Sequence, residues 1–486
     1  MKKSIYFLLA IGLLCLVGCS KAHEHVWTEP TCTEPATCEI CGITSGVAMG
    51  HTWVDATCTE PKHCSECGLT EGEALNHMWV DATCTEPKTC ERCGETVGEP
   101  LGHKYTEEII QEGTCTQDEI KKLTCSVCGY SETETTVALG HALEDVWVIE
   151  ATKDQCGQKY QVCANCDYES KIQNVYTNGF SYHGKLSVQG TDLVDQDGDK
   201  FQLIGLSTHG LQWYKGVVNK LTFSSLREKF GINVIRLALY SSEDGYAECT
   251  DSEREILYQT VVKGIKICTE LDMYVILDWH MVGAENVNDK NPLYYMSYAK
   301  EFYSRITEEF KDNENLLFDI MNEPCGDTTW SDCKKYANTI IPVIRANNDG
   351  IIICGNPKWT ADLDSCIKDP LRGYTNLMYS FHFYAGDGYY PDQITRALNA
   401  GLPVFISEHG GMENTGDGPI YEDNIQKWWS YLDERNISYV AWNISNSKGS
   451  ASIFKQGESY YDASDYYLKE WGLYYKNHVL TRLGLI

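Results

Sequence analysis

The sequence has 486 residues, of which 43% are hydrophobic and 22% charged, so it is long enough for several domains with a sizeable core and is not a disordered tail. Lys and Arg number 40 against 69 Asp and Glu, a net charge of −29 at pH 7. A surface this acidic repels phosphate backbones, which argues against nucleic acid as a partner.

The 23 cysteines are unevenly distributed along the chain. Fifteen lie between Cys32 and Cys166, and only six lie from Cys249 onwards. This division predicts three parts: a signal segment over residues 1–19, Cys-rich repeats over residues 20–178, and a larger domain over residues 179–486. Neither the sequence of the repeats nor their charge identifies a protein partner.

The first nineteen residues have the pattern of an export signal. Lys2 and Lys3 precede an apolar run from Ile5 to Val17, which is shorter than the ~20 residues that span a bilayer as a helix. The run resembles a bacterial lipoprotein signal, in which the Cys after a small residue carries the lipid. That resemblance predicts lipidation of Cys19 and an extracytoplasmic, cell-surface location. Ordinary secretion with cleavage elsewhere is the alternative.

The Cys-rich region contains an internal repeat with a period of 26 residues. Each unit has the form C-x5-C-x2-C-x9-H, with a Gly directly after the C-x2-C pair, and two looser copies follow the first three. The candidate metal ligands are Cys32, Cys38, Cys41, His51, Cys58, Cys64, Cys67, His77, Cys84, Cys90, Cys93, His103, Cys115, Cys125, Cys128 and His141.

Three Cys and one His per unit are the ligand set of a closed tetrahedral zinc site, as in zinc ribbons. Pairing within a unit would leave one thiol over, and so short a unit cannot bury a sufficient core without a metal or a covalent link. Export favours disulfides instead, so structural zinc is the prediction and disulfides stay open. The units resemble Cys-rich repeats near the membrane anchor of bacterial surface proteins, and a spacer is their plain interpretation.

From about residue 186 the pattern changes to short β-branched runs that alternate with helical periodicity. Eight strand-and-helix units in about 300 residues predict a (β/α)8 barrel. The first run lacks the Gly-rich turn of a dinucleotide-binding sheet. The runs are Phe201–Ser207, Ile232–Ala238, Met273–Trp279, Leu316–Met321, Ile351–Cys354, Leu377–Phe383, Val404–Ser407 and Ser438–Trp442.

Active sites of such barrels lie at the carboxyl ends of the strands, where nearly every run closes on a polar residue. Run four ends at Asn322-Glu323-Pro324, and run seven ends at Ser407-Glu408. Cleavage of an acetal needs such a carboxyl pair, one group to protonate the leaving oxygen and one to attack or stabilise the sugar carbon.

Residues from about 186 to 450 resemble glycoside hydrolase family 5, and most of all its endo-β-1,4-glucanases. The motifs that carry the resemblance include Ser207–Tyr214, Val234–Leu237, Asp278–His280, Asn322–Pro324, His382–Tyr384, Ser407-Glu408 and Ala441–Asn443.

The resemblance implies a retaining double displacement with Glu323 as acid/base and Glu408 as nucleophile, and no cofactor for catalysis. It implies supporting roles for Arg236, Asn322, His382, Tyr384 and His280. His209, Trp213, Tyr240, Trp359, Trp442 and Lys448 would bind substrate. Three His at strand ends also suit a metal site, but each matches a family position that hydrogen-bonds sugar or a catalytic Glu.

The predicted function is therefore an exported endo-β-1,4-glucanase (cellulase) that cuts internal bonds of a β-1,4-glucan. A β-mannanase or xyloglucanase is the alternative within the same class, because one barrel serves many glycans. A non-catalytic surface protein that binds glycan is the alternative of another class. The sequence does not determine product length or oligomeric state.

Overall fold

The computed structural model describes residues 23–282 and 288–486, and the predicted signal with Cys19 lies outside them. The chain divides into two compact units, one ending at His141 and one beginning at Ala142. The second unit therefore includes the last Cys-rich segment as well as the barrel. Among the described residues, no helix combines the length and the apolarity needed to cross a membrane.

The first unit consists of small antiparallel sheets, one for each repeat, in the order β1-β2, β3-β4-β5, β6-β7-β8 and β9-β10-β11. Their strands are β1 (Ala36–Thr37), β2 (Thr44–Ser45), β3 (Trp53–Val54), β4 (Lys62–Cys64), β5 (Thr70–Glu71), β6 (Trp79–Val80), β7 (Lys88–Cys90), β8 (Thr96–Val97), β9 (Tyr105–Gln111), β10 (Glu119–Cys125) and β11 (Ser131–Thr136).

Each repeat turns sharply at its C-x2-C pair. Gly68 follows one such pair with φ +71°, a conformation that favours glycine, and its N–H donates to the carbonyl of Cys64 at 2.9 Å. Gly42, Gly94 and Gly129 make the same turn in the other repeats. The sheets are two or three short strands with little apolar surface to bury, and the buried side chains within them are mainly cysteines.

The second unit opens with a sheet of β12 (Leu143–Ile149), β13 (Gly157–Cys163) and β14 (Gln173–Val175), then a hairpin of β15 (Ser187–Gln189) and β16 (Asp192–Val194). Register Gln189↔Asp192 places the hairpin turn at Gly190-Thr191. The acidic loop at Asp195 makes a second turn, in which its carboxylate accepts from the N–H groups of Asp197 and Asp199.

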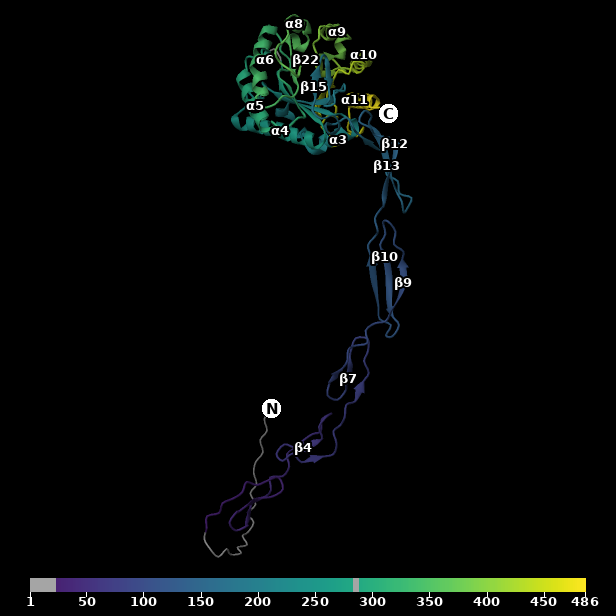
Figure 1. Ribbon diagram of the computed structural model, residues 1–486, viewed down its shortest axis with the longest axis vertical. Coiled ribbons are helices and arrows are strands. Elements are labelled where there is room, and N and C mark those ends of the chain that lie inside the picture. The colour runs from purple at the N-terminus through teal and green to yellow at the C-terminus, as the bar shows by residue number, and fades with distance from the viewer. Residues whose placement is uncertain (1–22, 283–287) are drawn as a thin grey trace. The chain divides into compact units, whose positions relative to one another are not determined.

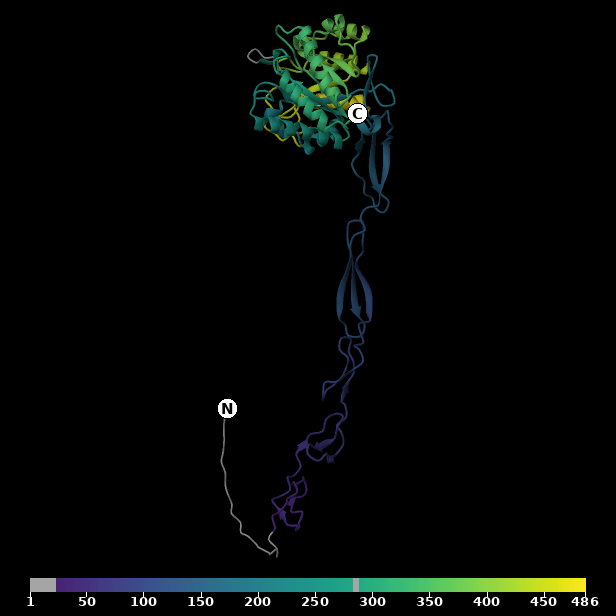
Figure 2. The same cartoon turned by 60° about the vertical axis from the view of Figure 1, so that its left-hand side comes forward.

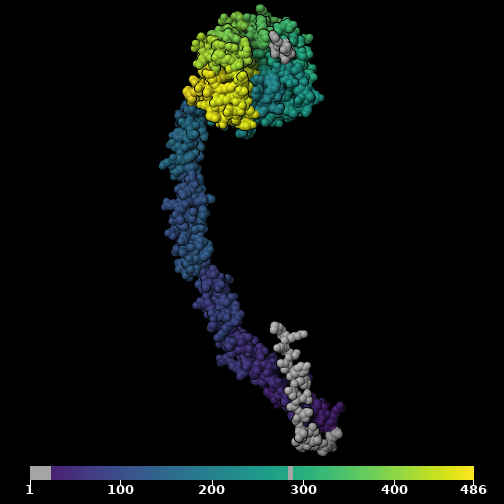
Figure 3. Space-filling model, turned by 180° about the vertical axis from the view of Figure 1, so that it is seen from behind, coloured from purple at the N-terminus to yellow at the C-terminus, as the bar shows by residue number. Residues whose placement is uncertain are grey.

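Eight parallel strands then close into a barrel in sequence order, which confirms the predicted (β/α)8 fold. Closure is made by β17 pairing with β24. Figure 3 shows the consequence on the surface, where the first strand-and-helix segments (teal) adjoin the last (yellow). The strands are β17 (Ile204–Thr208), β18 (Val234–Tyr240), β19 (Tyr274–His280), β20 (Leu316–Asp319), β21 (Ile352–Cys354), β22 (Leu377–Tyr384), β23 (Val404–Gly410) and β24 (Tyr439–Ile444).

Helices surround the strands, as Figures 1 and 2 show from two sides. The longer ones are α3 (Lys220–Phe230), α4 (Asp251–Glu270), α5 (Met296–Glu309), α6 (Trp330–Arg345), α9 (Asp392–Asn399), α10 (Glu422–Asp433) and α11 (Glu470–Arg482). Shorter pieces are α1 (Phe180–His183), α2 (Leu211–Tyr214), α7 (Pro357–Thr360), α8 (Leu363–Lys368), η1 (Lys215–Val217), η2 (Asn288–Lys290) and η3 (Ala385–Asp387). Capping boxes begin α4 at Thr250 and α6 at Thr329, and Gly231 ends α3.

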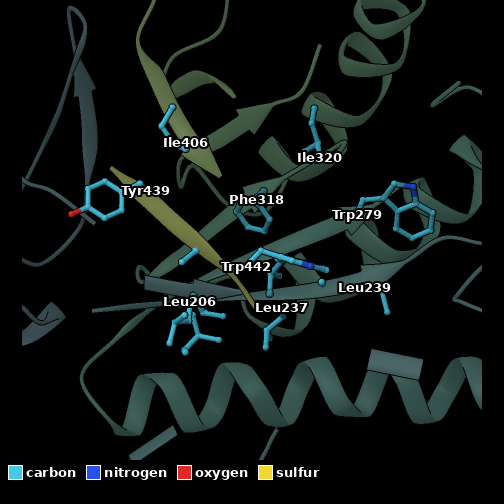
Figure 4. Close-up of a cluster of buried hydrophobic side chains, with 14 of the residues drawn as sticks. Leu206, Leu237, Leu239, Trp279, Phe318, Ile320, Ile406, Tyr439 and Trp442 are labelled. Carbon is cyan, nitrogen blue, oxygen red and sulfur yellow. The ribbon is translucent and has the colours of Figure 1, made fainter. Parts of the chain in front are cut away.

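The main core lies between the strands and the helices. Figure 4 shows buried side chains of this layer, among them Leu206, Leu237 and Trp279. Leu237 packs on α4 so closely that a Cβ at Gly264 would lie 2.6 Å from its Cδ1. Gly264 therefore interrupts an otherwise amphipathic helix because that position has no room for a side chain.

A second apolar cluster includes residues from every barrel strand except β17, together with the hairpin residues Leu186 and Leu193. On β18 it includes Val234, two residues before Arg236, and on β19 it includes Ile276, two residues before Asp278. Because side chains alternate with a period of two, the same face of each strand changes from apolar to charged. The charged part lies toward the carboxyl ends, where the site forms.

Candidate active site

Arg236 on β18 is fully buried and lies at the centre of a charged cluster. Its guanidinium contacts Asp278 at 3.1 Å, Asp319 at 3.0 Å and Glu408 at 3.2 Å, and it donates to the amide oxygen of Asn322 at 2.6 Å. The strand ends of β18, β19, β20 and β23 are thereby joined by one cation. Five donors in a rigid fork suit this position better than a lysine would.

Asp278 and Asp319 are two buried residues of the site for which no role was predicted from the sequence. Burial raises the pKa of Asp278 to about 7 and that of Asp319 to about 6, in each case against the opposing charge of Arg236. Both occur as the inward-facing residue near the end of an apolar strand. That signal was present in the sequence, since a buried charge on a strand requires a buried partner.

Replacing Arg236 with Met is expected to destabilise the barrel unit by about 3–5 kcal/mol at neutral pH, because the buried carboxyl groups of Asp278, Asp319 and Glu408 lose the cation that they share. The loss should shrink at pH 5, where the Asp278 and Asp319 carboxyls take up protons. Urea unfolding followed by tryptophan fluorescence measures both values. Arg305→Met, which removes an exposed pair with Glu255, is the matched control and should cost no more than about 1 kcal/mol. Equal effects of the two substitutions would contradict a central role for Arg236.

Glu408 on β23 is 5% exposed and receives a hydrogen bond on each oxygen. Tyr384 donates to Oε1 at 2.8 Å, and Arg236 donates to Oε2 at 3.2 Å. Both donors stabilise a negative charge on the carboxylate and hold it in one orientation. The carboxyl group is thus held in one orientation by two donors, an arrangement that suits a nucleophile.

Glu323 follows β20 and has a different environment. Its side chain is 17% exposed, and its Oε1 lies 2.9 Å from Nδ1 of His382. Burial raises the pKa of Glu323 to about 8, a tendency that Asp278 and Asp319 strengthen and Arg236 opposes. Burial also lowers the pKa of His382 to about 4, so the imidazole is neutral beside a protonated carboxyl group at pH 7. The two carboxyl groups of the site thus have different environments: Glu408 accepts from two donors, whereas burial favours the protonated form of Glu323.

The activity is therefore expected to fall as the pH rises above about 8, because deprotonation of Glu323 removes the proton that the leaving oxygen needs. The alkaline limb of a kcat/KM against pH profile measures this pKa in the free protein. A profile that stays flat up to pH 10 would contradict the assignment of Glu323 as the acid.

Asn322 and His280 are tied into the same network. The Asn322 amide group donates to the carbonyl of Met281 at 2.9 Å and lies 3.3 Å from Nε2 of His280, whose Nδ1 lies 2.7 Å from Asp278. Burial lowers the pKa of His280 to about 3, which keeps the ring neutral. A sugar hydroxyl that bonds to Asn322 would therefore meet an amide group whose orientation is already fixed by Met281 and His280.

Aromatic side chains lie together beside these polar groups. Trp442 on β24 stacks with His280 at 5.1 Å and lies 5.3 Å from His209, and Tyr240 also stacks with His280 at 4.2 Å. Trp213 is 48% exposed and contacts the Tyr240 ring at 5.1 Å. The structure thus brings four of the predicted substrate-binding residues into one group around His280, from α2, β18, β24 and the end of β17.

Glu323 and Trp359 line a cleft of about 400 Å³ together with His382, Tyr384 and Asn414. Trp359 is 52% exposed, and it lies in a left-handed turn in which Lys358, Trp359 and Thr360 have φ values of 60°, 55° and 58°. Two bonds hold this turn: Trp359 N–H donates to the carbonyl of Pro324 at 3.0 Å, and the Thr360 hydroxyl donates to the carbonyl of Asn322 at 2.5 Å. Three strained residues in a row persist only where the surroundings fix them, as here against the Glu323 segment.

Lys448 is exposed on the loop after β24. Its backbone carbonyl accepts a hydrogen bond from the ammonium of Lys469, and its side-chain charge interacts with the carboxylate of Asp417. Among the described residues no contact joins Lys448 to either carboxyl group of the pair. Its predicted role in substrate binding stays a prediction.

His409 directly follows Glu408 and is fully buried. Its Nδ1 donates to the carbonyl of Val440 at 2.9 Å, and its Nε2 accepts from the indole N–H of Trp429 at 3.1 Å. Burial lowers the pKa of His409 to about 3, in keeping with a neutral ring used on both nitrogens. Trp428 and Trp429 are both core residues, and Trp429 holds the ring of His409, the residue next to Glu408 on β23.

The candidate metal ligands of the first unit gather in clusters, but not within single repeats. Cys32 lies with His51, Cys64 and Cys67, and Cys58 lies with His77, Cys90 and Cys93. Cys84 lies with His103, Cys125 and Cys128, while Cys38 and Cys41 lie with His23 and His25. The grouping by unit that the spacing suggested is wrong, because the chain leaves each C-x2-C pair along a strand and its next His reaches the following pair. Cys115, buried, and His141 are the last predicted ligands of this unit.

A parallel barrel that carries two carboxyl groups with different environments at the carboxyl ends of its strands has the site of a glycoside hydrolase. Residues 194–448, more than half of the chain, match the family described as Cellulase (glycosyl hydrolase family 5). The chain belongs to that family, as the sequence resemblance predicted.

Two curated relatives are bacterial endoglucanases. The chain is 43% identical to Endoglucanase A of Butyrivibrio fibrisolvens over 59% of its own length and 66% of the relative's, and 40% identical to Endoglucanase of Clostridium saccharobutylicum over 57% and 61%. It thus spans less than two thirds of either relative. Among solved structures, the catalytic domain of Thermobifida fusca endoglucanase Cel5A in complex with cellotetraose is similar at 30% identity, with a TM-score of 0.57 over 62% of this chain and 98% of that one.

Proposed function

We propose that this protein is an endo-β-1,4-glucanase that cleaves internal glucosidic bonds with retention of configuration. The observation that carries the proposal is the pair of carboxyl groups with opposite environments: Glu408 holds two hydrogen-bond donors, and Glu323 lies beside neutral His382 with its pKa raised by burial. A retaining hydrolase needs one ionised and one protonated carboxyl group facing one bond.

In the first step the Glu408 carboxylate attacks the anomeric carbon while Glu323 gives its proton to the leaving oxygen. The product is a glycosyl ester on Glu408 and a free sugar end. In the second step Glu323, now ionised, takes a proton from water, and the resulting hydroxide breaks the ester. Glu323 is thereby protonated again, the Glu408 carboxylate leaves the anomeric carbon, and the second inversion restores the original configuration.

The glucan specificity is supported by the similar proteins. Two of them are named endoglucanases, and one solved structure is the catalytic domain of an endoglucanase in complex with cellotetraose. The aromatic rings around His280 and the exposed Trp359, which lines a cleft with Glu323, offer flat apolar faces for sugar rings. Release of reducing ends from carboxymethyl-cellulose, compared with mannan, xyloglucan and xylan, tests the proposal. Preference for mannan or xyloglucan would replace it by the alternative hydrolase, and no release from any glycan would favour the non-catalytic binding protein.

We also propose that the chain is anchored at the cell surface through a lipid on Cys19. The apolar run that ends at Gly18-Cys19 supports this, and both residues lie outside the described part of the chain. Cys19→Ala is expected to shift the protein from the detergent phase to the aqueous phase in a Triton X-114 partition, because single-Cys lipidation is lost. Unchanged partition of the variant would contradict the lipid anchor.

For the repeats we propose structural zinc, with the enzyme's chemistry independent of it. The support is the closeness of Cys and His ligand atoms, which lie within 4.8 Å of one another in each cluster. Four protein ligands close the coordination shell, which is the mark of a structural site rather than a catalytic one. A spacer between anchor and barrel remains the plain interpretation of this region.

A further inference from the structure

The clusters of the first unit have the dimensions of tetrahedral zinc sites. A tetrahedron with Zn–S bonds of about 2.3 Å separates two sulfurs by about 3.8 Å. The Sγ atoms of Cys32 and Cys64 are 3.8 Å apart, those of Cys58 and Cys90 are 3.7 Å apart, and those of Cys84 and Cys125 are 3.8 Å apart. A disulfide would need about 2.05 Å, so these pairs are spaced as ligands of a shared ion.

The histidines meet the same requirement through Nδ1. A sulfur and a nitrogen on one zinc lie about 3.5 Å apart. His51 Nδ1 is 3.3 Å from Cys67 Sγ, and the equivalent distances are 3.4 Å for His77 with Cys93 and for His103 with Cys128. At His77 the other ring nitrogen lies 3.4 Å from a Glu95 oxygen, a partner that would hold the imidazole with Nδ1 free to bind metal.

The membership of the clusters crosses the repeat boundary. Each of these three sites takes a C-x2-C pair together with the His that precedes that pair in the sequence. Its remaining ligand is a single Cys from the T-C-T-E-P segment that lies before this His. The single Cys32 lies 19 residues before its partner His51, and Cys58, which lies between His51 and Cys64, belongs to the next site along. The sites are therefore interlaced along the chain, not strung one after another.

We infer that each zinc ion after the first links two consecutive repeats, so that the metal ions connect the repeats into one continuous series of cross-links. This inference rests on the proposed structural zinc and adds which residues share each ion. It also explains both ends of the series. The first C-x2-C pair, Cys38 and Cys41, has no earlier T-C-T-E-P segment among the described residues, and His23 stands with His25 to complete its set of four.

At the other end, Cys156 occupies the first-Cys position of the last repeat. In the second unit it lies in an apolar cluster with Leu480 and Leu485, near the hydroxyl of Thr177, and not among metal ligands. An interlaced series requires one such leftover, because no C-x2-C pair follows it. A series of self-contained repeats would have used this cysteine as a ligand.

Two double variants of the full chain distinguish shared sites from self-contained ones. If ions are shared, C32S/C64S damages one site, whereas C32S/C38S damages two. If each repeat holds its own ion, C32S/C64S damages two sites and C32S/C38S one. Zinc that remains bound is counted by plasma mass spectrometry after equilibration with pyridylazoresorcinol, at a concentration that leaves the unmodified chain fully loaded.

The expected result is a loss of one zinc per chain for C32S/C64S and of two for C32S/C38S, with no loss for the control C249S, which changes a half-buried thiol of the barrel unit. The reverse order of losses would overturn the sharing while leaving structural zinc in place. An unmodified chain without zinc and with oxidised thiols in the repeats would overturn the structural zinc itself. Hydrolysis by the barrel is measured separately and does not enter either outcome.

Discussion

Glu408→Gln is expected to lower the hydrolysis of β-1,4-glucan by a factor on the order of 10⁴ or more, with the fold unchanged. The amide is nearly the same size: its oxygen can still accept from Arg236, and its NH2 group can donate to the hydroxyl oxygen of Tyr384, the two partners that hold the carboxylate now. It is a far weaker nucleophile, so the glycosyl ester cannot form. Initial rates on carboxymethyl-cellulose measure the loss, and thermal unfolding verifies the fold.

The matched control is Glu228→Gln, the same change on the exposed face of α3. Its activity should equal that of the unmodified protein. Retention of more than a few per cent of activity in Glu408→Gln would remove Glu408 from the mechanism and with it the proposed double displacement.

Glu323→Ala is expected to separate the two chemical roles. Hydrolysis of cellulose should fall by about 10²–10⁴-fold, because the sugar oxygen that leaves needs a proton. A dinitrophenyl cellobioside carries a leaving group that is stable as an anion, so attack by Glu408 should proceed on it without Glu323. The glycosyl ester should then accumulate, because the base that activates water is missing.

A burst of dinitrophenolate equal to one enzyme equivalent, followed by slow turnover, is the measured signature. Added azide should speed the slow phase, since a small anion attacks the ester without base assistance and fits a cavity left by the removed carboxyl group. Equal losses on cellulose and on the activated substrate would show that Glu323 is not the acid. The loss of the alkaline limb of the pH profile on the activated substrate is a second check of the same assignment.

Much of this site was predictable from sequence because barrel strands are short and end in the chemistry. The eight apolar runs match β17–β24 to within a few residues. Arg236, Asn322, Tyr384 and Glu408 are joined by hydrogen bonds, and Glu323 bonds to His382. Local pattern is enough here, because parallel strands in a closed barrel necessarily bring their carboxyl ends together.

Other parts of the site depended on contacts between distant segments. Asp319 lies in the predicted run Leu316–Met321, but no role was predicted for it, since nothing local shows that its side chain meets Arg236, 83 residues away. The left-handed turn at Trp359 arises from bonds to Asn322 and Pro324 and has no signature in composition. The neutral state of His409 likewise follows from its burial in the fold, where its two ring nitrogens bond to Val440 of β24 and Trp429 of α10.

The repeats illustrate the division between sequence and tertiary structure most directly. By itself the sequence determined which residues are candidate ligands, because a period of 26 and a C-x2-C turn are local properties of the chain. It likewise determined the barrel and its carboxyl pair. Only the tertiary structure decided which cysteine meets which histidine, since spacing counts residues along the chain whereas metal ligands and ion pairs are selected by distance in space. For the same reason, the candidate catalytic residues can be predicted from the strand ends, whereas their protonation states depend on burial and on neighbouring charges.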